Sequence, residues 1–310
     1  MTEGSFAGSP RRLLRFGLVG TGYWAQIVHG PALASTPGIE FTAVWGRNPL
    51  AAGAIADSLG ATAHSDFGTF LADVDAVAFC VPPDVQSALA LQAANAGKHL
   101  LLEKPIALSE EAADALVLAV EDAQVASVVF FTDRFQPKVR AWLADVTTGN
   151  WTGAYAIWLG SALARSSPFD TPWRRVHGGL WDLGPHVVSL LSASLGPVIS
   201  VLADSGPGDV THLILHHDGG ATSTVTATLG APPSVDGLDL NLWGQSGRSE
   251  APVRGGDAIA ALRVALSELV QNVRSGSVSH PCDVHFGRDV TRILAEAQHQ
   301  IDARHRPERP

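Results

Sequence analysis

The hydrophobic and polar positions of the chain follow one pattern up to about residue 134 and another beyond it. In the first part, short apolar segments bounded by glycine or proline alternate with longer segments of helical period, which is typical of a parallel sheet covered by helices. The strands predicted by this pattern lie near 15–20, 40–45, 75–81, 99–103 and 126–132. The predicted helices lie near 23–35, 49–59, 84–96 and 109–123. We therefore predict a doubly wound α/β domain over residues 1–133.

After residue 134 the apolar segments read as antiparallel strands. A helix is predicted near 137–147, followed by the segments AYAIWLGSAL, VISVLA, THLILHH, STVTATL and DLNLW, which glycine and proline separate. Such short alternating segments are typical of an antiparallel sheet with one covered face. Further helices are predicted near 185–195, 256–274 and 286–302. The second domain, residues 134–310, is therefore predicted to be α+β with an open, mainly antiparallel sheet.

Length, composition and charge narrow the classes of function. A chain of 310 residues exceeds the size at which single cores stop growing, about 250 to 300 residues, and suits two packed domains. Hydrophobic residues make up 46% and charged residues 16%, which excludes a disordered or coiled-coil protein. With 21 basic and 30 acidic residues and no long basic run, nucleic acid is not an expected partner. No apolar stretch is long enough to cross a membrane and no secretory leader is recognisable, so we expect a cytoplasmic protein.

The cysteines and the histidine-rich segments give no indication of a metal site. Cys80 and Cys282 are too few for a disulfide framework or a four-thiolate site. The segment HPCDVH at 280–285 holds several ligand types, but its proline and the lack of a partner cluster favour a loop leading into the last helix. We therefore expect no metal.

A glycine-rich turn follows the first predicted strand. In GTGYWA, the first glycine permits a tight turn, the second lets a pyrophosphate approach the backbone, and the small Ala25 allows the helix to pack closely on the strand. The N–H groups at the start of the helix then face the phosphates. The sequence thus predicts a dinucleotide bound at Gly20, Thr21, Gly22, Tyr23 and Trp24.

The end of the second predicted strand bears on which dinucleotide binds. A carboxylate there holds a free ribose hydroxyl, whereas an arginine accommodates a 2′-phosphate. The strand ends in WGRN, with Arg47 and Asn48 and no acid. Glu40 begins the strand and therefore lies roughly 16 Å away, at about 3.3 Å per residue. We expect NADP rather than NAD. The alternative is that Arg47 is a solvated surface charge and Asn48 only caps the next helix.

Lys104 lies in the segment EKP, at the carboxyl end of the strand HLLLE, where open α/β sheets bind their ligands. The chain has three lysines, Lys98, Lys104 and Lys138, against 18 arginines. A lysine kept at this position indicates a need for a compact ammonium group. The alternative is a capped strand edge with a lysine that extends to solvent.

Asp182 and His186 form a second candidate pair, in the segment GGLWDLGPH. Pro185 suits the first turn of the following helix, so His186 projects from that turn and Asp182 lies just before it. The carboxylate is then close enough to orient or charge the imidazole, and histidine is the natural acceptor of a proton when a hydroxyl becomes a carbonyl. The same spacing is also common in helix caps without catalytic function.

Taken in order, these segments resemble the glucose-fructose oxidoreductase, inositol dehydrogenase and rhizopine catabolism family, Gfo/Idh/MocA. The resemblance covers nearly the whole chain, and the matching segments are GLVGTGYWA (17–25), VPPDVQSALALQAANAGKHLLLEKP (81–105), RFQP (134–137) and PWRR followed by GGLWDLGPH (172–186). It implies a Rossmann domain, an open-faced α/β domain and a nicotinamide cofactor in the crevice between them. It also implies hydride transfer at a hydroxyl carbon of a sugar, cyclitol or related polyol, and a homo-oligomer formed through the second sheet.

The family's functional positions carry over residue by residue. Its catalytic lysine falls on Lys104, and its paired aspartate and histidine fall on Asp182 and His186. Trp173 and Arg174 are candidates for walls of the substrate pocket, or for packing between the domains. The residues expected to bind the cofactor are Gly20, Thr21, Gly22, Tyr23, Trp24, Arg47, Asn48, Val81, Pro82, Gln86, Glu103 and Lys104.

Two positions depart from the family's pattern. Gln86 stands where many members have a histidine, which bears on one contact with the cofactor. The glycine triplet before the aspartate is reduced to Gly178 and Gly179, which bears on the geometry of the substrate loop.

The reaction predicted from these residues is proton removal by His186 while a hydride passes to the nicotinamide, or the reverse. Lys104 would hydrogen-bond the reacting oxygen and Asp182 would orient the imidazole. Two alternatives stay open. One is a cofactor-binding regulator or scaffold that keeps the fold without turnover. The other is an enzyme that reduces an imine or an unsaturated bond, which needs no hydroxyl base.

Overall fold

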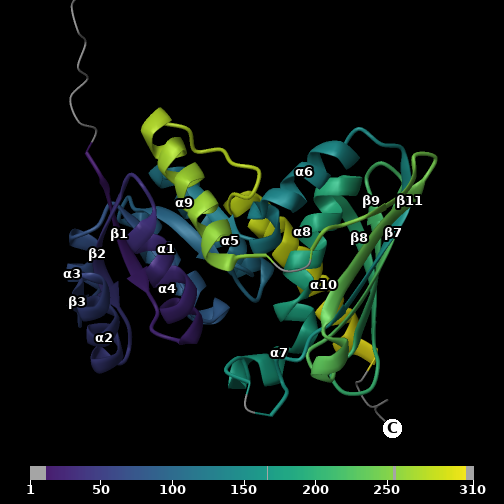
Figure 1. Ribbon diagram of the computed structural model, residues 1–310, viewed down its shortest axis with the longest axis horizontal. Helices are drawn as coiled ribbons and strands as arrows, with labels where there is room; N and C mark the ends of the chain where they lie inside the picture. Colours follow the sequence, from purple (N-terminus) through teal and green to yellow (C-terminus); the bar gives the residue numbers. More distant parts are fainter. Residues whose placement is uncertain (1–11, 166, 254–255, 305–310) are drawn as a thin grey trace, which may run out of the picture.

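Two six-stranded sheets organise the chain, which a computed structural model describes over residues 12–165, 167–253 and 256–304 (Figure 1). The first sheet is parallel throughout, in the order β3-β2-β1-β4-β5-β6. Its strands are β1 (Leu14–Val19), β2 (Ile39–Trp45), β3 (Thr62–His64), β4 (Ala76–Phe79), β5 (His99–Glu103) and β6 (Ser127–Phe130). The doubly wound sheet predicted from the sequence is confirmed.

Helices cover both faces of this sheet, and their first residues explain where they begin. The Asn48 side chain accepts hydrogen bonds from the N–H groups of Leu50 and Ala51, and Pro49 is the first helical residue, so a helix starts there. Ser109 caps the helix that follows β5 in the same way. The helices of this part are η1 (Ala25–His29, a π-helix), α1 (Gly30–Ser35), α2 (Pro49–Leu59), α3 (Phe67–Ala72), α4 (Pro83–Asn95), α5 (Glu110–Ala123) and η2 (Thr132–Phe135).

The second sheet has the order β12-β11-β7-β10-β9-β8 and is mainly antiparallel, as predicted; its one parallel pair is β7 with β10. Its strands are β7 (Trp151–Leu159), β8 (Val198–Ser205), β9 (Thr211–His217), β10 (Thr222–Thr228), β11 (Gly237–Gly244) and β12 (Gly247–Glu250). Helices cover one face, and no described element covers the other (Figure 1). The remaining helices are α6 (Pro137–Val146), α7 (Pro172–Asp182), α8 (Gly184–Leu195), η3 (Pro233–Val235), α9 (Ala258–Ser275) and α10 (Val284–Arg304).

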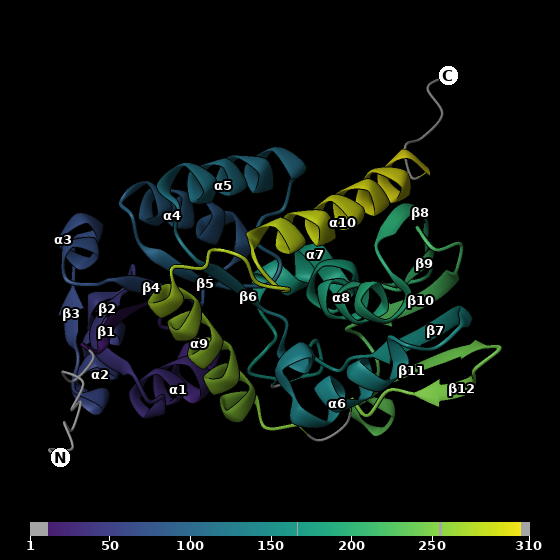
Figure 2. The same cartoon turned by 90° about the horizontal axis from the view of Figure 1, so that it is seen from above.

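The last two helices tie the two sheets together. In Figure 2, α9 lies beside α1 on one side of the first sheet, and α10 runs from α5 on the other side toward β8 of the second sheet. The backbone N–H of Val284 donates to the Ser127 hydroxyl over 3.0 Å, which anchors the start of α10 on β6. The C-terminal part of the chain therefore completes the helical layers of the N-terminal sheet.

The pattern of apolar residues missed two strands, β3 and β12, and two α-helices, α3 and α7, besides the short 3-10 helices η2 and η3. The edge strands β3 and β12 are short and largely exposed, and α3 has only six residues, so none of them carries a clear periodic signal. Helix α7 contains Gly178, whose φ of 60° breaks the helical conformation and favours glycine. Because two of its eleven residues are glycine, the sequence pattern does not predict this helix.

Candidate active site

A cavity of about 1630 Å³ lies where the carboxyl ends of β1, β4, β5 and β6 face the second sheet and the helices α7 and α8. One wall consists of the glycine-rich turn and the segments after β4 and β5. The opposite wall comes from α7, the first turn of α8, the end of β7 and the segment before β11. Ligands bind at this edge of open α/β sheets. The cavity is therefore the candidate site.

Lys104 and Asp182, 78 positions apart in the chain, meet in this cavity. The Lys104 ammonium donates to the Asp182 carboxylate over 2.9 Å and to the Asp182 backbone carbonyl over 2.7 Å. Asp182 is the last residue of α7, and only 6% of its surface is exposed. Two oxygen atoms at the end of α7 thus fix the Lys104 ammonium at the carboxyl end of β5.

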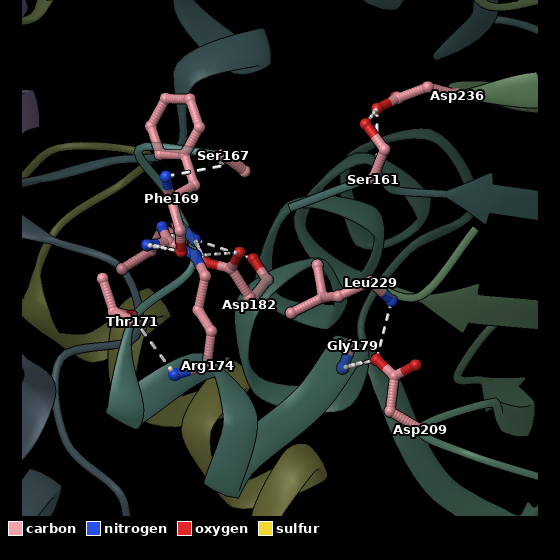
Figure 3. Close-up of polar contacts among 11 residues, drawn as sticks. Ser161, Ser167, Phe169, Thr171, Arg174, Gly179, Asp182, Asp209, Leu229 and Asp236 are labelled. Carbon is pink, nitrogen blue, oxygen red and sulfur yellow. Dashed lines mark hydrogen bonds and ion pairs between the residues drawn. The ribbon is translucent and has the colours of Figure 1, made fainter. Parts of the chain in front are cut away.

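Arg174 also binds Asp182, and Figure 3 shows it lying between that carboxylate and the backbone of Phe169. Its Nε donates to Asp182 over 2.7 Å and its Nη1 donates to the carbonyl oxygen of Phe169 over 3.3 Å. Burial by itself raises the pKa of Asp182, but the charges of Lys104 and Arg174 hold it well below its usual range. Asp182 is therefore ionised, and its carboxylate lies between two cationic side chains.

His186 projects from the first turn of α8 into the same cavity, and only 8% of its surface is exposed. Its ring lies 5.6 Å from that of Trp158, centroid to centroid, and its Nδ1 has no hydrogen-bond partner among the described residues. Burial lowers the pKa of His186 well below its usual range, and the positive charge of Lys104 lowers it further. The imidazole is therefore neutral at physiological pH, with a nitrogen that can accept a proton.

The hydrogen bond expected between Asp182 and His186 is absent among the described contacts. Both carboxylate oxygens of Asp182 bind cations instead. A carboxylate gains more from two charged donors than from a neutral imidazole, which accounts for this choice. Asp182 therefore positions Lys104 and Arg174, and it does not orient His186 by a direct contact.

The two residues proposed as walls of the substrate pocket, Trp173 and Arg174, both line the cavity. The indole of Trp173 packs on His177 with ring centroids 5.4 Å apart, and its Nε1 is buried without a hydrogen-bond partner among the described residues. Phe169 continues this wall, because its ring contacts Tyr23 and Trp24 edge-on at centroid distances of 5.5 and 5.9 Å. The wall thus reaches across the cavity to the glycine-rich turn.

The glycine-rich turn has the geometry that a dinucleotide requires. Gly20 has a φ of 128°, and a Cβ there would lie 2.2 Å from the carbonyl oxygen of Cys80, so only glycine fits. At Gly22 a Cβ would meet no atom within 4 Å, because this residue faces open space at the edge of the cavity. Thr21 does not line the cavity; its methyl group instead packs against Gly46, the residue after β2. Tyr23 and Trp24 line the cavity beside Gly22.

Arg47 and Asn48, the two residues expected at the end of β2, have different places. Arg47 is exposed, lines the cavity and forms no ion pair with any described residue. Asn48 does not line the cavity, and its side chain caps α2. Glu40 pairs in register with Arg15 near the start of β1, which is the far end of the sheet from the cavity. No acidic residue therefore takes the position that would hold a free ribose hydroxyl at the end of β2.

Of the residues expected after β4 and β5, Val81, Pro82, Glu103 and Lys104 line the cavity, whereas Gln86 does not. The Gln86 side chain is fully buried, donates to the carbonyl oxygens of Glu103 and Pro105, and accepts from the N–H of Glu103 over 2.8 Å. The side-chain amide of Gln86 thus forms hydrogen bonds with both the carbonyl oxygen and the N–H of Glu103 at the end of β5. Gln86 therefore holds Glu103 and Lys104 in position from behind.

Asp133 is a cavity residue that sequence reasoning missed. It lies in η2, directly after β6, and its carboxylate has no hydrogen bond or ion pair with any described residue. Burial raises the pKa of Asp133 to about 6. The segment RFQP, which resembles the family's pattern, begins at the next residue, Arg134. The signal that could have identified Asp133 is its position just after a strand of the parallel sheet, at the edge where ligands bind. An unpaired carboxylate here is suited to accept hydrogen bonds from a ligand.

The described ranges lack the features of two further classes of protein, those that span a membrane and those that bind a metal ion. No helix in them is long and apolar enough to span a bilayer. They contain no group of three or more histidine, cysteine or acidic side chains arranged to hold a metal ion.

Residues 14–131 match the oxidoreductase family with an NAD-binding Rossmann fold. The chain is 28% identical over 227 residues to inositol 2-dehydrogenase of Rhizobium meliloti, and this alignment covers 69% of this chain and 68% of that protein. It is 29% identical over 236 residues to D-xylose 1-dehydrogenase (NADP(+)) 2 of Haloferax volcanii, covering 71% and 70%. The solved structure of GenD2 from gentamicin A biosynthesis, in complex with NAD, shares the fold with a TM-score of 0.82 at 20% identity and covers 94% of this chain and 95% of that one.

These matches agree with the order of motifs along the chain. The residues matched by the family model include the glycine-rich turn and the EKP segment, and the structural likeness extends over both sheets. The comparisons therefore support the resemblance to the Gfo/Idh/MocA family of oxidoreductases, whose family model matches residues 14–131.

Proposed function

We propose that this protein is an NADP-dependent oxidoreductase that transfers a hydride between the nicotinamide and a hydroxyl or ketone carbon of a sugar, cyclitol or related polyol. The observation that carries the proposal is the meeting of Lys104, Asp182 and His186 on one cavity whose other wall is the glycine-rich turn. The named activities of the relatives, on inositol and D-xylose, support the substrate class.

The residues around the turn fit a dinucleotide. The open space at Gly22 and the tight turn at Gly20 leave the backbone accessible to a pyrophosphate. When bound, the nicotinamide supplies the group that accepts or gives the hydride. The chain's own contribution is to position the substrate carbon and to manage the proton of its oxygen.

The proton chemistry follows from the charges in the cavity. The Lys104 ammonium donates a hydrogen bond to the reacting oxygen and stabilises negative charge that develops there, while Asp182 and Arg174 keep it in place. The neutral His186 accepts the hydroxyl proton during oxidation and returns it during reduction. Because burial disfavours the imidazolium, His186 in its protonated form is a strong acid and readily returns the proton to an alkoxide.

The preference for NADP rests on Arg47, which is exposed beside the cavity and has no carboxylate partner among the described residues. We expect Arg47→Ala to weaken NADP⁺ binding by about 10- to 100-fold, since hydrogen bonds to a charged group contribute about 1.5–3 kcal/mol. NAD⁺ binding should change by less than about twofold, because NAD⁺ lacks the 2′-phosphate. Titration calorimetry with both dinucleotides measures this, and Arg263→Ala, which changes an exposed arginine of α9, is the control. Equal loss for both dinucleotides would contradict the assignment.

The raised pKa of Asp133 predicts how the activity depends on pH in the acidic range. The raised pKa of its carboxyl means that the charged form, the better acceptor for substrate hydroxyls, is lost as the pH falls through about 6. The lowered pKa of His186 places protonation of the base at a more acidic pH. We therefore expect kcat/KM for oxidation to decline below about pH 6, and Asp133→Asn to abolish that decline while raising KM. Persistence of the same decline in Asp133→Asn would show that another group causes it.

Self-association through the open face of the second sheet is also part of the proposal. Large apolar side chains point from this face and are about half exposed: Ile157, Leu202, Ile214 and Trp243. Their registers place them on one side of the sheet. Such a patch favours contact with a second copy of the chain.

A panel of sugars and cyclitols, each incubated with the protein and either NADP⁺ or NAD⁺, tests the proposed function. The formation of reduced nicotinamide is followed by its absorbance. Turnover of at least one polyol with NADP⁺ is the expected result. Tight NADPH binding without turnover of any polyol, ketone or imine would favour a regulator or scaffold instead.

A further inference from the structure

Asp209 lies in the loop between β8 and β9, and its carboxylate accepts three hydrogen bonds from two other elements. Its Oδ2 accepts from the backbone N–H groups of Gly179 and Leu229 over 3.1 and 2.6 Å, as Figure 3 shows. Its Oδ1 accepts from the Thr228 hydroxyl over 2.5 Å. The carboxylate thus joins this loop to helix α7 and to the end of β10.

The contact with Gly179 falls where α7 is interrupted. Gly178 has a φ of 60° and a ψ of −162°, so the helical conformation stops there and resumes at Gly179. The N–H of Leu183 donates to the Gly179 carbonyl over 2.9 Å, which shows that a new helical turn begins at Gly179. The first N–H groups of a helix have no partner in the same helix, and a side-chain oxygen satisfies them. Asp209 therefore caps the second part of α7 from a distant loop.

Both glycines of the pair noted in the sequence have a tertiary reason. Gly178 adopts a positive φ, which favours glycine, and a Cβ there would lie 3.2 Å from the Cβ of Asp209. A Cβ at Gly179 would lie 3.0 Å from the backbone N and Cα of Thr228 in β10. The pair therefore lets α7 approach both β10 and Asp209 closely.

The residues that follow this anchor carry two groups of the candidate site. Asp182 ends α7 and holds the Lys104 ammonium, and His186 lies in the first turn of α8. The N–H of His186 donates to the Leu183 carbonyl over 3.1 Å, so helical hydrogen bonds continue across the junction of the two helices. A displacement at residue 179 is therefore transmitted to both groups.

The contact with Leu229 fixes the neighbouring wall of the cavity. Leu229 lines the cavity and belongs to a small apolar cluster with Leu183, against which Trp158 packs. The Trp158 ring in turn lies against His186. One carboxylate, Asp209, therefore holds both the segment that carries the imidazole and the wall beside it.

We propose that Asp209 is a positioning residue for the hydride transfer, an inference that rests on the proposed function. By anchoring residues 179–186 and the end of β10, it holds His186, and Lys104 through Asp182, at the same substrate carbon. Asp209 does not itself line the cavity. A displacement of about 1 Å in reacting groups can cost about 10²-fold in rate, even when its cause lies away from the chemistry.

Two variants of the full-length protein test this role. Asp209→Ala removes all three acceptor contacts. Asp209→Asn keeps them, because the amide oxygen can accept from both backbone N–H groups and the amide nitrogen can donate to the Thr228 hydroxyl. We expect kcat for a polyol to fall by about 10- to 100-fold in Asp209→Ala and to stay within about threefold of the wild type in Asp209→Asn. Each kcat is expressed per NADPH-binding site, counted by fluorescence titration, so that loss of folded protein does not count.

The binding of NADPH and a second helix cap separate positioning from loss of stability. The dissociation constant for NADPH should stay within about threefold in both variants, because the glycine-rich turn forms the other wall. Asp257 accepts from the N–H groups of Ile259 and Ala260 at the start of α9 over 2.9 and 3.1 Å, and it does not line the cavity. Asp257→Ala therefore removes a similar cap and should keep kcat per site. A normal kcat per site in Asp209→Ala, or an equal fall in Asp257→Ala, would overturn the positioning role.

Amide hydrogen exchange in the cofactor-free protein gives a readout that does not depend on activity. Peptides covering residues 179–186 should exchange about tenfold faster in Asp209→Ala, and at the wild-type rate in Asp209→Asn and Asp257→Ala. Unchanged exchange in Asp209→Ala would contradict the anchor. Faster exchange in a protein whose wild type turns over no polyol would uphold the anchor and refute the proposed function. Polyol turnover with an unchanged kcat in Asp209→Ala would refute the positioning role alone.

Discussion

Replacing Lys104 with methionine should lower turnover by about a thousandfold and leave NADPH binding within about threefold of the wild type. Methionine keeps the length of the side chain but removes the charged donor, and loss of one such donor to a developing oxyanion costs about 10²- to 10³-fold. Loss of the ammonium that fixes the substrate oxygen adds to this cost. Arg174 still binds Asp182 in the variant, so the carboxylate does not become an unpaired buried charge.

The measurements are steady-state kcat with the best polyol substrate and NADPH titration by fluorescence. Lys138→Met is the matched control, since Lys138 is exposed at the start of α6, outside the residues that line the cavity. Near wild-type kcat in Lys104→Met would remove Lys104 from the reaction. A parallel loss of NADPH binding would instead assign it to holding the cofactor.

Replacing His186 with asparagine should lower the oxidation of a polyol by about 10²- to 10⁴-fold, the range expected for loss of a general base. Asparagine keeps a polar side chain in the buried position beside Trp158, but it cannot accept the hydroxyl proton. NADPH binding should be unchanged within about threefold, because His186 lies on the second-domain wall and the glycine-rich turn lies on the other. The pH profile of the remaining activity should lose any decline that His186 caused.

This variant also distinguishes the kinds of bond that the enzyme reduces. Reduction of an imine or an unsaturated bond involves no hydroxyl proton, so an enzyme of that type would keep its activity in His186→Asn. His299→Asn is the control, since His299 is exposed on α10 and does not line the cavity. Full activity on a polyol in His186→Asn would show that water or another group takes the proton.

The sequence by itself determined the alternation of strands and helices and the local positions of the chemical groups. The buried strands β4 and β5 are nearly continuous apolar runs, and the caps at Asn48 and Ser109 mark helix starts, so both signals are local. Lys104 follows β5 directly, which already placed it at the ligand-binding edge of the sheet. Short elements such as β3 were not predicted, because three largely exposed residues carry no measurable period.

Only the tertiary structure decided which of these groups meet. Asp182 precedes His186 by four positions, yet its carboxylate binds Lys104 and Arg174, because the fold brings a cation from β5 within 2.9 Å. The raised pKa of the unpaired Asp133 carboxyl likewise comes from desolvation in the folded protein and has no local sequence signal. Local patterns specify the conformation of a segment, whereas partners, burial and the resulting pKa shifts arise from contacts between distant segments.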